Sequence, residues 1–201
     1  MNLRETVKHR VVKATGWGRP RYAAVEAALR KRTSPRAIRF ADDGTIPNNP
    51  TLPLLVYPGV VDLARFGDPA AAFEALFEAQ GWGDTWRNGI YDYAHYHSAI
   101  HEVLGVARGR ARVRFGGERG REIALSAGDV AILPAGTGHQ RLDASPDFLV
   151  VGAYPGDGTY DECTGWVDEH ARALDSIPKV PLPERDPVFG ADGPLITAWA
   201  R

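Results

Sequence analysis

The chain has 201 residues, 44% of them hydrophobic, which is enough for one sizeable core. Its 24 basic and 25 acidic residues give a formal net charge of -1, so nothing in the charge favours nucleic acid or an anionic membrane as a partner. The single cysteine, Cys163, excludes an internal disulfide and fits a reducing compartment. No apolar signal core follows Met1, and no stretch approaches the ~20 apolar residues of a membrane span, so we expect a cytoplasmic protein.

The first 35 residues are basic and carry one predicted helix. Tyr22, Val25 and Leu29 recur at helical spacing within residues 21 to 31, which indicates an amphipathic accessory helix. The basic run at residues 30 to 32 is typical of a solvated helix end, and nucleic-acid binding is the less favoured alternative.

Two further elements precede the histidine-rich part of the chain. Residues 54 to 57 form a short apolar run after a turn-rich stretch, which predicts a strand. Asp68 and Pro69 are a good helix start, with Asp as the cap, and the helix should end near Gly81. We expect both elements to cover a barrel.

Beyond Trp86 the periodicity changes to that of strands. Residues 110 to 115 alternate arginine with apolar residues, which predicts a half-buried strand with Arg110, Arg112 and Arg114 toward solvent. An anion-binding stripe is the alternative for these arginines. Further short strands are predicted over residues 123 to 125, 130 to 133 and 148 to 154, a spacing that favours an all-β sandwich or barrel.

After Tyr154 the composition changes again. A short helix is predicted over residues 165 to 174, followed by a proline-rich arm over residues 178 to 194. The organisation we expect is an N-terminal accessory segment (1–35), a barrel with covering elements (36–155), and a C-terminal helix with the arm (156–201). Cys163 lies in a polar stretch far along the chain from the histidines, so a catalytic thiol is disfavoured.

Four of the six histidines fall between residues 95 and 139. In a strand, alternate side chains share a face, so His95 and His97 should point the same way with α-carbons ~7 Å apart. That separation allows two imidazoles to bind one ion, and neutral imidazole is the commonest metal ligand in proteins.

Two blocks of spaced residues surround these histidines. The first block is Gly89, five residues, His95-x-His97, four residues, Glu102, six residues and Gly109. The second block is Gly128, five residues, Pro134-x-Gly136, two residues, His139, three residues and Asp143. Position by position they resemble the paired signature of the cupin superfamily. Only Asp143 departs from it, where the family has Asn at a position that usually serves turn geometry.

The flanking segments at residues 38 to 44, 86 to 90 and 186 to 190 are similar to a small bacterial cupin group of the YjlB type. The resemblance covers residues 36 to 200 and brings no established reaction with it. It implies an all-β, single-domain fold, a double-stranded β-helix or jelly-roll-like barrel of six to eight strands, with accessory N- and C-terminal helices. It also implies a homodimer, because cupins commonly pair through edge strands or terminal arms.

The resemblance implies one divalent transition metal ion per chain, held by four ligands, His95, His97, Glu102 and His139. Imidazoles and a carboxylate suit Fe, Mn, Ni, Co, Cu or Zn. A divalent ion together with these ligands carries a formal charge of about +1, which should attract an anionic substrate oxygen. His101 is the alternative to Glu102, but Glu102 is an acid at the right distance from Gly109. His101 has the opposite strand parity, so it should either contact the ligands without binding the metal or lie at the surface.

Tyr91, Tyr93 and Arg141 share parity with neighbouring ligands and, with His101, are candidates for lining the cavity, although aromatic residues inside a barrel are more often core. The leading function is a metal-dependent enzyme, a dioxygenase-like oxidoreductase, acting on a small organic molecule. One alternative is an isomerase or decarboxylase in which Tyr93 or His101 moves a proton. Another is a cupin that binds a small molecule without catalysis.

Overall fold

The computed structural model describes residues 3–16, 18–31, 33–156 and 160–200. Its strands are β1 (Arg36–Ile38), β2 (Leu54–Tyr57), β3 (Trp82–Asn88), β4 (Glu102–Arg108), β5 (Arg110–Phe115), β6 (Arg121–Ser126), β7 (Val130–Leu133), β8 (His139–Ala144) and β9 (Leu149–Pro155). Its helices are α1 (Leu3–Thr15), α2 (Tyr22–Glu26), α3 (Pro69–Ala79), α4 (Val167–Ser176) and α5 (Pro194–Ala198), with 3-10 turns η1 (Leu63–Arg65) and η2 (Ile177–Lys179).

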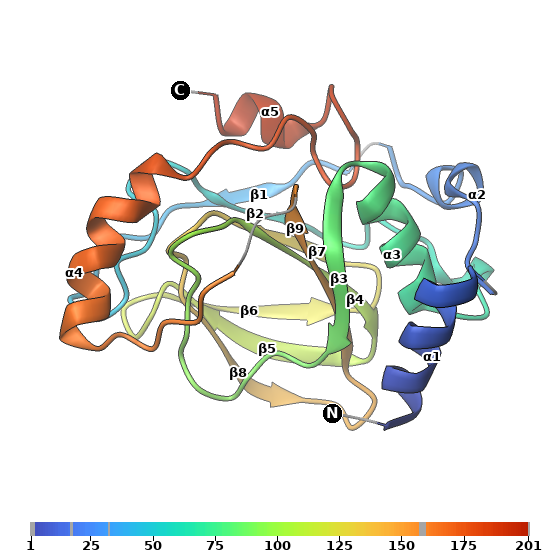
Figure 1. Ribbon diagram of the computed structural model, residues 1–201, viewed down its shortest axis with the longest axis horizontal. Coiled ribbons are helices and arrows are strands. Elements are labelled where there is room, and N and C mark those ends of the chain that lie inside the picture. The colour runs from blue at the N-terminus through green and yellow to red at the C-terminus, as the bar shows by residue number, and fades with distance from the viewer. Residues whose placement is uncertain (1–2, 17, 32, 157–159, 201) are drawn as a thin grey trace.

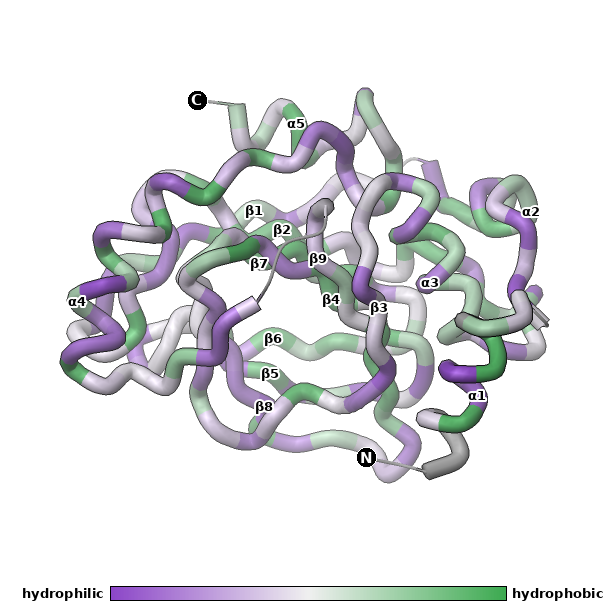
Figure 2. Tube along the Cα trace, viewed as in Figure 1, coloured by the Kyte–Doolittle hydropathy of each residue, from purple (hydrophilic) through white to green (hydrophobic). Residues whose placement is uncertain are grey.

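The strands form two antiparallel sheets that face each other (Figure 1). One sheet has the order β1-β2-β7-β4-β9-β3, and the other has the order β6-β5-β8. This is the all-β, jelly-roll-like fold that the resemblance implies, with nine strands among the described residues where the resemblance implies six to eight. Figure 2 shows hydrophobic residues along the central strands and a mixture of hydrophilic and hydrophobic residues along α4.

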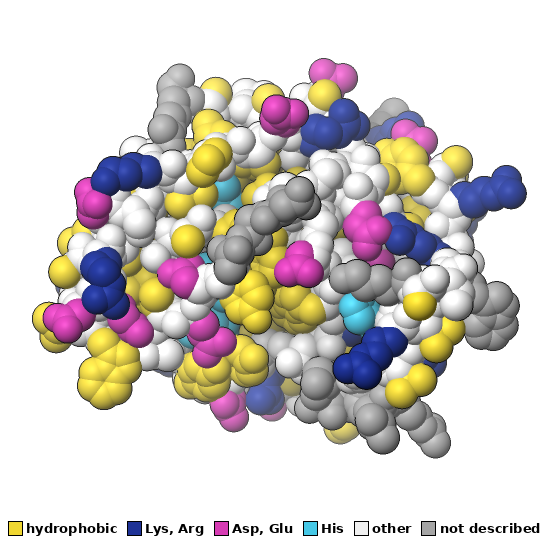
Figure 3. Space-filling model, in the orientation of Figure 1, with side chains coloured by type: hydrophobic (Ala, Val, Ile, Leu, Met, Phe, Trp, Pro, Cys, Tyr) yellow, Lys and Arg dark blue, Asp and Glu magenta, His cyan; other side chains and the backbone are white. Residues whose placement is uncertain are grey.

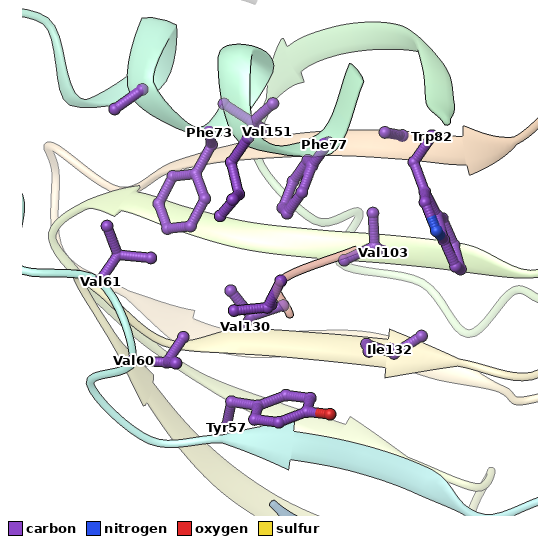
Figure 4. Close-up of a cluster of buried hydrophobic side chains, with 14 of the residues drawn as sticks. Tyr57, Val60, Val61, Phe73, Phe77, Trp82, Val103, Val130, Ile132 and Val151 are labelled. Atoms are coloured by element: carbon purple, nitrogen blue, oxygen red, sulfur yellow. The ribbon is translucent and has the colours of Figure 1, made fainter. Parts of the chain in front are cut away.

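The central strands of the larger sheet are buried on both faces, because alternate side chains enter two different cores. In β2, Leu54 and Val56 point between the sheets, whereas Leu55 and Tyr57 point to the outer face beneath α3. Figure 4 shows the aromatic rings of α3 against this outer face. The helix comes so close that a Cβ at Gly105 would lie 2.5 Å from the Phe73 ring, so only glycine fits there.

Several elements match the sequence expectations. The Asp68 side chain accepts a hydrogen bond from the Ala70 N–H (3.2 Å), Pro69 opens α3, and the helix ends at Ala79. β2 spans the predicted residues. In β5, Arg110 and Arg112 are exposed and Arg114 half-exposed, as predicted for a solvent-facing stripe.

Other expectations were wrong. The helix predicted over residues 21 to 31 is only the five-residue α2, because Leu29 pairs with Val61 in a β-bridge; Arg32 lies outside the described residues. Neither α1 nor β3 was anticipated. Residues 91 to 97 are not a regular strand but an extended segment with two isolated bridges, His95 to His139 and Tyr96 to Cys163. The helix predicted over residues 165 to 174, in contrast, is present as α4 and is shifted by two residues.

The terminal segments are tied to the barrel by buried polar groups. The Arg87 guanidinium of β3 donates to Glu74 (2.6 and 2.8 Å) and to Asp68 (2.9 Å), and His9 of α1 contacts the same Glu74 carboxylate at 2.7 Å. At the other end, the Trp199 indole donates to the Pro53 carbonyl (2.9 Å). No helix among the described residues has the length and apolar character needed to cross a membrane.

Candidate metal centre

Three buried histidines converge at one end of the barrel. His95 and His97 come from the extended segment between β3 and β4, and His139 opens β8. The main chain brings them together, because the His95 N–H donates to the His139 carbonyl (3.2 Å) and the His139 N–H donates to the His95 carbonyl (2.9 Å). One nitrogen from each ring lies within 4.8 Å of the others, so the three residues could hold a metal ion.

Each imidazole is oriented by a backbone carbonyl. Nδ1 of His95 lies 3.2 Å from the Tyr93 carbonyl, and Nδ1 of His139 lies 3.2 Å from the Thr137 carbonyl. Nδ1 of His97 contacts the Asp161 carbonyl. A carbonyl oxygen accepts a hydrogen bond only from a nitrogen that bears a proton. All three Nδ1 atoms therefore carry the hydrogen, and each Nε2 is left as the ligand atom. This arrangement is typical of metal-binding histidines.

Glu102, at the start of β4, faces the same centre. Its carboxylate oxygens lie 3.6 Å from His97 Nε2 and 3.5 Å from His139 Nε2, and its side chain is buried. Within the described part of the chain, Glu102 Oε2 accepts no hydrogen bond. A buried carboxylate oxygen without a hydrogen-bond donor is costly, and coordination of a cation would satisfy it. The residues therefore fit a divalent metal ion.

The electrostatic environment differs from one histidine of the centre to the next. Burial alone would lower the pKa of His97, but the Glu102 carboxylate and the Asp161 carbonyl outweigh it and raise that pKa to about 9. Burial lowers the pKa of His95, and burial together with the two neighbouring histidines lowers the pKa of His139 far more. Two of the three rings are thus held neutral, the state in which imidazole binds metals.

The centre lies in the wall of a cavity of about 300 Å³, which has room for a small organic molecule. Beyond the histidines and Glu102, its lining comes mainly from β3 and the segment that follows it, residues 89–91, and its aromatic members are Trp86, Tyr91, Tyr154 and Tyr160. The Trp86 indole donates to the Tyr154 hydroxyl (3.1 Å). Burial raises the pKa of Tyr154, and the Glu102 charge raises it further, so this phenol stays protonated.

A segment that we call the strap, residues 160–163, passes beside the histidines. Its bridge pairs Cys163 with Tyr96, with N–H to carbonyl bonds of 2.9 Å in both directions. The Asp161 carboxylate accepts bonds from the Ser98 N–H (2.9 Å), the Ser98 hydroxyl (2.6 Å) and the Ala99 N–H (3.0 Å). The strap therefore fixes the segment that carries His97, and its carbonyl orients the His97 ring.

The four suggested pocket residues are placed differently from one another. Tyr91 lines the cavity, and Tyr93 stacks on Tyr91 (4.9 Å) at its rim, donating to Glu162 (2.6 Å). Arg141 turns away from the cavity, and its Nε donates to the Ile90 carbonyl (2.9 Å). His101 is fully buried, accepts from the Ala135 N–H (2.9 Å) and packs on Trp199, so it is neither at the surface nor among the cavity-lining residues described.

Sequence reasoning missed the residues that complete the site. Tyr154 and Trp86 lie on neighbouring strands, and their inward direction follows from the alternation of β9, where Val150, Gly152 and Tyr154 share one face. Nothing in the local sequence places the strap beside His97, because that contact joins residues 64 positions apart. Cys163 is near the site after all, but burial and the Asp161 carboxylate raise its pKa to about 12, which disfavours a thiolate nucleophile.

No family model matches the chain. The uncharacterised protein YjlB of Bacillus subtilis (strain 168) is 42% identical over 162 residues, which is 81% of this chain and 94% of that protein. Among solved structures, the TDP-quinovose 3,4-ketoisomerase WlaRB from Campylobacter jejuni matches with 15% identity and a TM-score of 0.37, over 44% of this chain and 73% of that one. An 11S globulin from Wrightia tinctoria matches with 19% identity and a TM-score of 0.32, over 39% of this chain and 21% of that one.

The identity to YjlB extends over nearly the whole of that protein and includes no large unmatched region of it. The two glycine-spaced blocks lie in the barrel strands and turns that bring the three histidines together. The chain therefore belongs to the YjlB-type group of the cupin superfamily.

Proposed function

We propose that this protein is a metal-dependent enzyme that acts on a small organic molecule, with one divalent transition metal ion held by His95, His97, His139 and Glu102. The observation that supports it most strongly is the convergence of three oriented imidazoles and an unsatisfied carboxylate oxygen in the wall of a cavity. A purely structural site would have no need of a cavity of this size beside it.

The leading reaction class is that of a dioxygenase-like oxidoreductase. When bound, the ion would supply Lewis acidity and open positions for substrate and dioxygen. The chain's own residues would do the rest. Trp86, Tyr154 and Tyr160 limit the size of the substrate and exclude water from one side of it.

Tyr154 supports a second candidate, an isomerase or decarboxylase. Its hydroxyl lies in the cavity wall and accepts a hydrogen bond from Trp86, and it holds its proton because burial and then the Glu102 charge raise its pKa. A protonated phenol at this position could donate to a developing carbanion or enolate oxygen. Tyr93 lies at the rim of the cavity, and His101 is not among the residues described as lining it.

Metal analysis of protein purified without added metal tests the proposal. We expect about one transition metal ion per chain in the wild-type protein and none in His97→Ala, because loss of one imidazole removes a ligand and opens the site to water. Full metal occupancy in His97→Ala, with circular dichroism unchanged, would overturn the ligand assignment.

Oxygen consumption separates the two reaction classes. The metal-loaded protein is screened against small carboxylates, phenols and sugars with an oxygen electrode and, in parallel, by NMR for substrate loss without oxygen uptake. Turnover with oxygen uptake supports the oxidoreductase. Turnover without it, abolished in Tyr154→Phe at unchanged metal content, supports the proton-transfer enzyme. Metal binding without turnover of any compound would favour the non-catalytic binding protein.

A further inference from the structure

The charges that line the cavity are unevenly placed. Among the described residues, its charged side chains besides the histidines are Asp84, Arg87, Glu102 and Glu162. The Arg87 guanidinium is fully buried and paired with both Glu74 and Asp68, so its charge is already compensated. Asp84 and Glu162 are exposed at the mouth, and Figure 3 shows acidic side chains around a hollow with hydrophobic and histidine side chains deeper inside it.

Two pairs of stacked tyrosines lie in or beside the cavity, and one of them contacts Glu162. Tyr93 donates to Glu162 and stacks on Tyr91, which lies edge-on to His95 at 5.2 Å. On the other side, Tyr160 stacks on Tyr154 at 5.2 Å and lies 5.6 Å from the His97 ring. Glu162 therefore lies among the tyrosines of the cavity, and a carboxylate together with electron-rich rings is an environment that binds alkylammonium groups.

The deep end of the cavity has the opposite character once the proposed ion is present. Three neutral imidazoles and one carboxylate leave a divalent ion with a formal charge of about +1, which attracts an anionic oxygen. All four residues that would hold the ion line the cavity, so the ion would lie in the cavity wall. The cavity thus has a positive deep end and a negative, aromatic mouth.

We infer that the ligand is a small zwitterion, with a carboxylate at the metal end and an alkylammonium group at the mouth between Glu162, Asp84 and the tyrosines. The inference rests on the proposed metal site. It narrows the expectation of an anionic substrate, because a second negative charge on the ligand would face the two carboxylates at the mouth.

The test uses two probes of the same shape. In 4-(trimethylammonio)butanoate the tail is cationic, and in 5,5-dimethylhexanoate a carbon atom replaces the nitrogen. Isothermal titration of the metal-loaded protein should show the ammonium compound binding about tenfold more tightly, the ratio expected for one cation held by aromatic rings and a carboxylate. Pentanedioate, with an anionic tail, should bind more weakly than either probe.

The variant Asp84→Asn/Glu162→Gln should bind both isosteric probes equally. Asn tolerates the positive φ of 48° at position 84, so the change removes charge without strain. Asp192→Asn, an exposed acid outside the cavity lining, should keep the full preference. Equal binding of the two probes to the metal-loaded wild-type protein, or binding of neither, would overturn the zwitterion. Protein that takes up no metal would overturn the proposed function and this inference with it, and metal analysis of the same samples distinguishes the two failures.

Discussion

Trp86 occupies the space that a side chain at position 152 would need. Gly152 faces Trp86 across the β3 and β9 pair, and a Cβ there would lie 2.1 Å from the indole ring. The same indole donates to the Tyr154 hydroxyl. The absence of a side chain at Gly152 therefore leaves room for Trp86, and Trp86 in turn bonds to Tyr154, so two residues of the cavity wall depend on this glycine.

We expect Gly152→Ala to lower the free energy of unfolding by about 1–3 kcal/mol, because the added methyl forces the Trp86 ring out of its place. Urea unfolding followed by tryptophan fluorescence measures this. Gly83→Ala is the matched control on the same strand pair, where the nearest atom to the new Cβ is 3.8 Å away. Equal destabilisation by both substitutions would contradict the packing argument.

At the scale of elements, α3 is joined to β3 by a buried ion pair. Glu74 of α3 holds the Arg87 guanidinium of β3 through two hydrogen bonds, and both side chains are almost fully buried. The Glu74 and Asp68 carboxylates outweigh burial and raise the pKa of Arg87 above its ordinary value, so the charge persists at every accessible pH.

Glu74→Gln should cost about 3–5 kcal/mol of stability, because it leaves a buried guanidinium with Asp68 as its one remaining carboxylate among the described ion pairs. Thermal unfolding measures the loss. Glu78→Gln, one turn further along α3, breaks a partly exposed pair with Arg19 and should cost about 1 kcal/mol or less. A Glu74→Gln protein as stable as Glu78→Gln would show that Arg87 is not held by this pair.

The strap is the second element whose contribution can be measured. Asp161→Ala removes the bonds to the Ser98 and Ala99 N–H groups, so the His97 ring loses its fixed carbonyl partner. We expect metal affinity to fall about 10- to 100-fold, as for other groups that orient a metal-bound histidine. Competition with a chromophoric chelator gives the affinity, and unchanged affinity would mean that the strap does not position His97. The control Asp175→Ala, on α4, removes an exposed ion pair with Lys179 of η2 and should leave the metal affinity unchanged.

Elements with a strong local signal were predicted from the sequence, and elements defined by distant contacts were not. The Asp68-Pro69 cap, the apolar run of β2 and the alternation of β5 each carry their own evidence. β3 reads Trp-Gly-Asp-Thr-Trp-Arg-Asn, without a clean alternation, and bulges between Gly83 and Trp86. Its pairing with β9 supplies the order that the sequence lacks.

In the candidate site, too, residues with a local sequence signal were predicted and residues brought in by distant contacts were not. The spacing of glycines and histidines predicted which ligands would meet, since turns fix where each strand begins. Strand parity made Arg141 a candidate for lining the cavity, but its Nε bonds to the Ile90 carbonyl and it is not among the lining residues described. Tyr160, Asp161 and Glu162 could not be assigned, because only the three-dimensional path of the chain brings them to the histidines.

For the whole molecule, metal binding should be visible in stability. An ion that binds the folded chain alone adds about 4 kcal/mol at a concentration 1,000 times its dissociation constant. Removing it with dipicolinate should lower the unfolding midpoint by roughly 8–16 °C for a chain of this size. Differential scanning calorimetry measures this, and His97→Ala should show no shift. An equal shift in both proteins would mean that the chelator acts elsewhere.

The homodimer implied by the cupin resemblance stays a prediction. Sedimentation velocity at several protein concentrations tests it, with one species of about twice the chain mass of 21.9 kDa as the expected result. A single species at the chain mass across the range would contradict it.

In this chain, the orientation of the metal-binding rings and the lining of the cavity mouth are set by different groups. Ring orientation is set by the main-chain carbonyls of Tyr93, Thr137 and Asp161, and the Asp161 side chain matters because its bonds to Ser98 and Ala99 hold that carbonyl in place. The mouth of the cavity, by contrast, is built from side chains of β3 and the strap. Ligand preference can therefore be redesigned at positions such as 84 and 162 while the metal chemistry stays intact, which makes the barrel a scaffold for exchanging substrates.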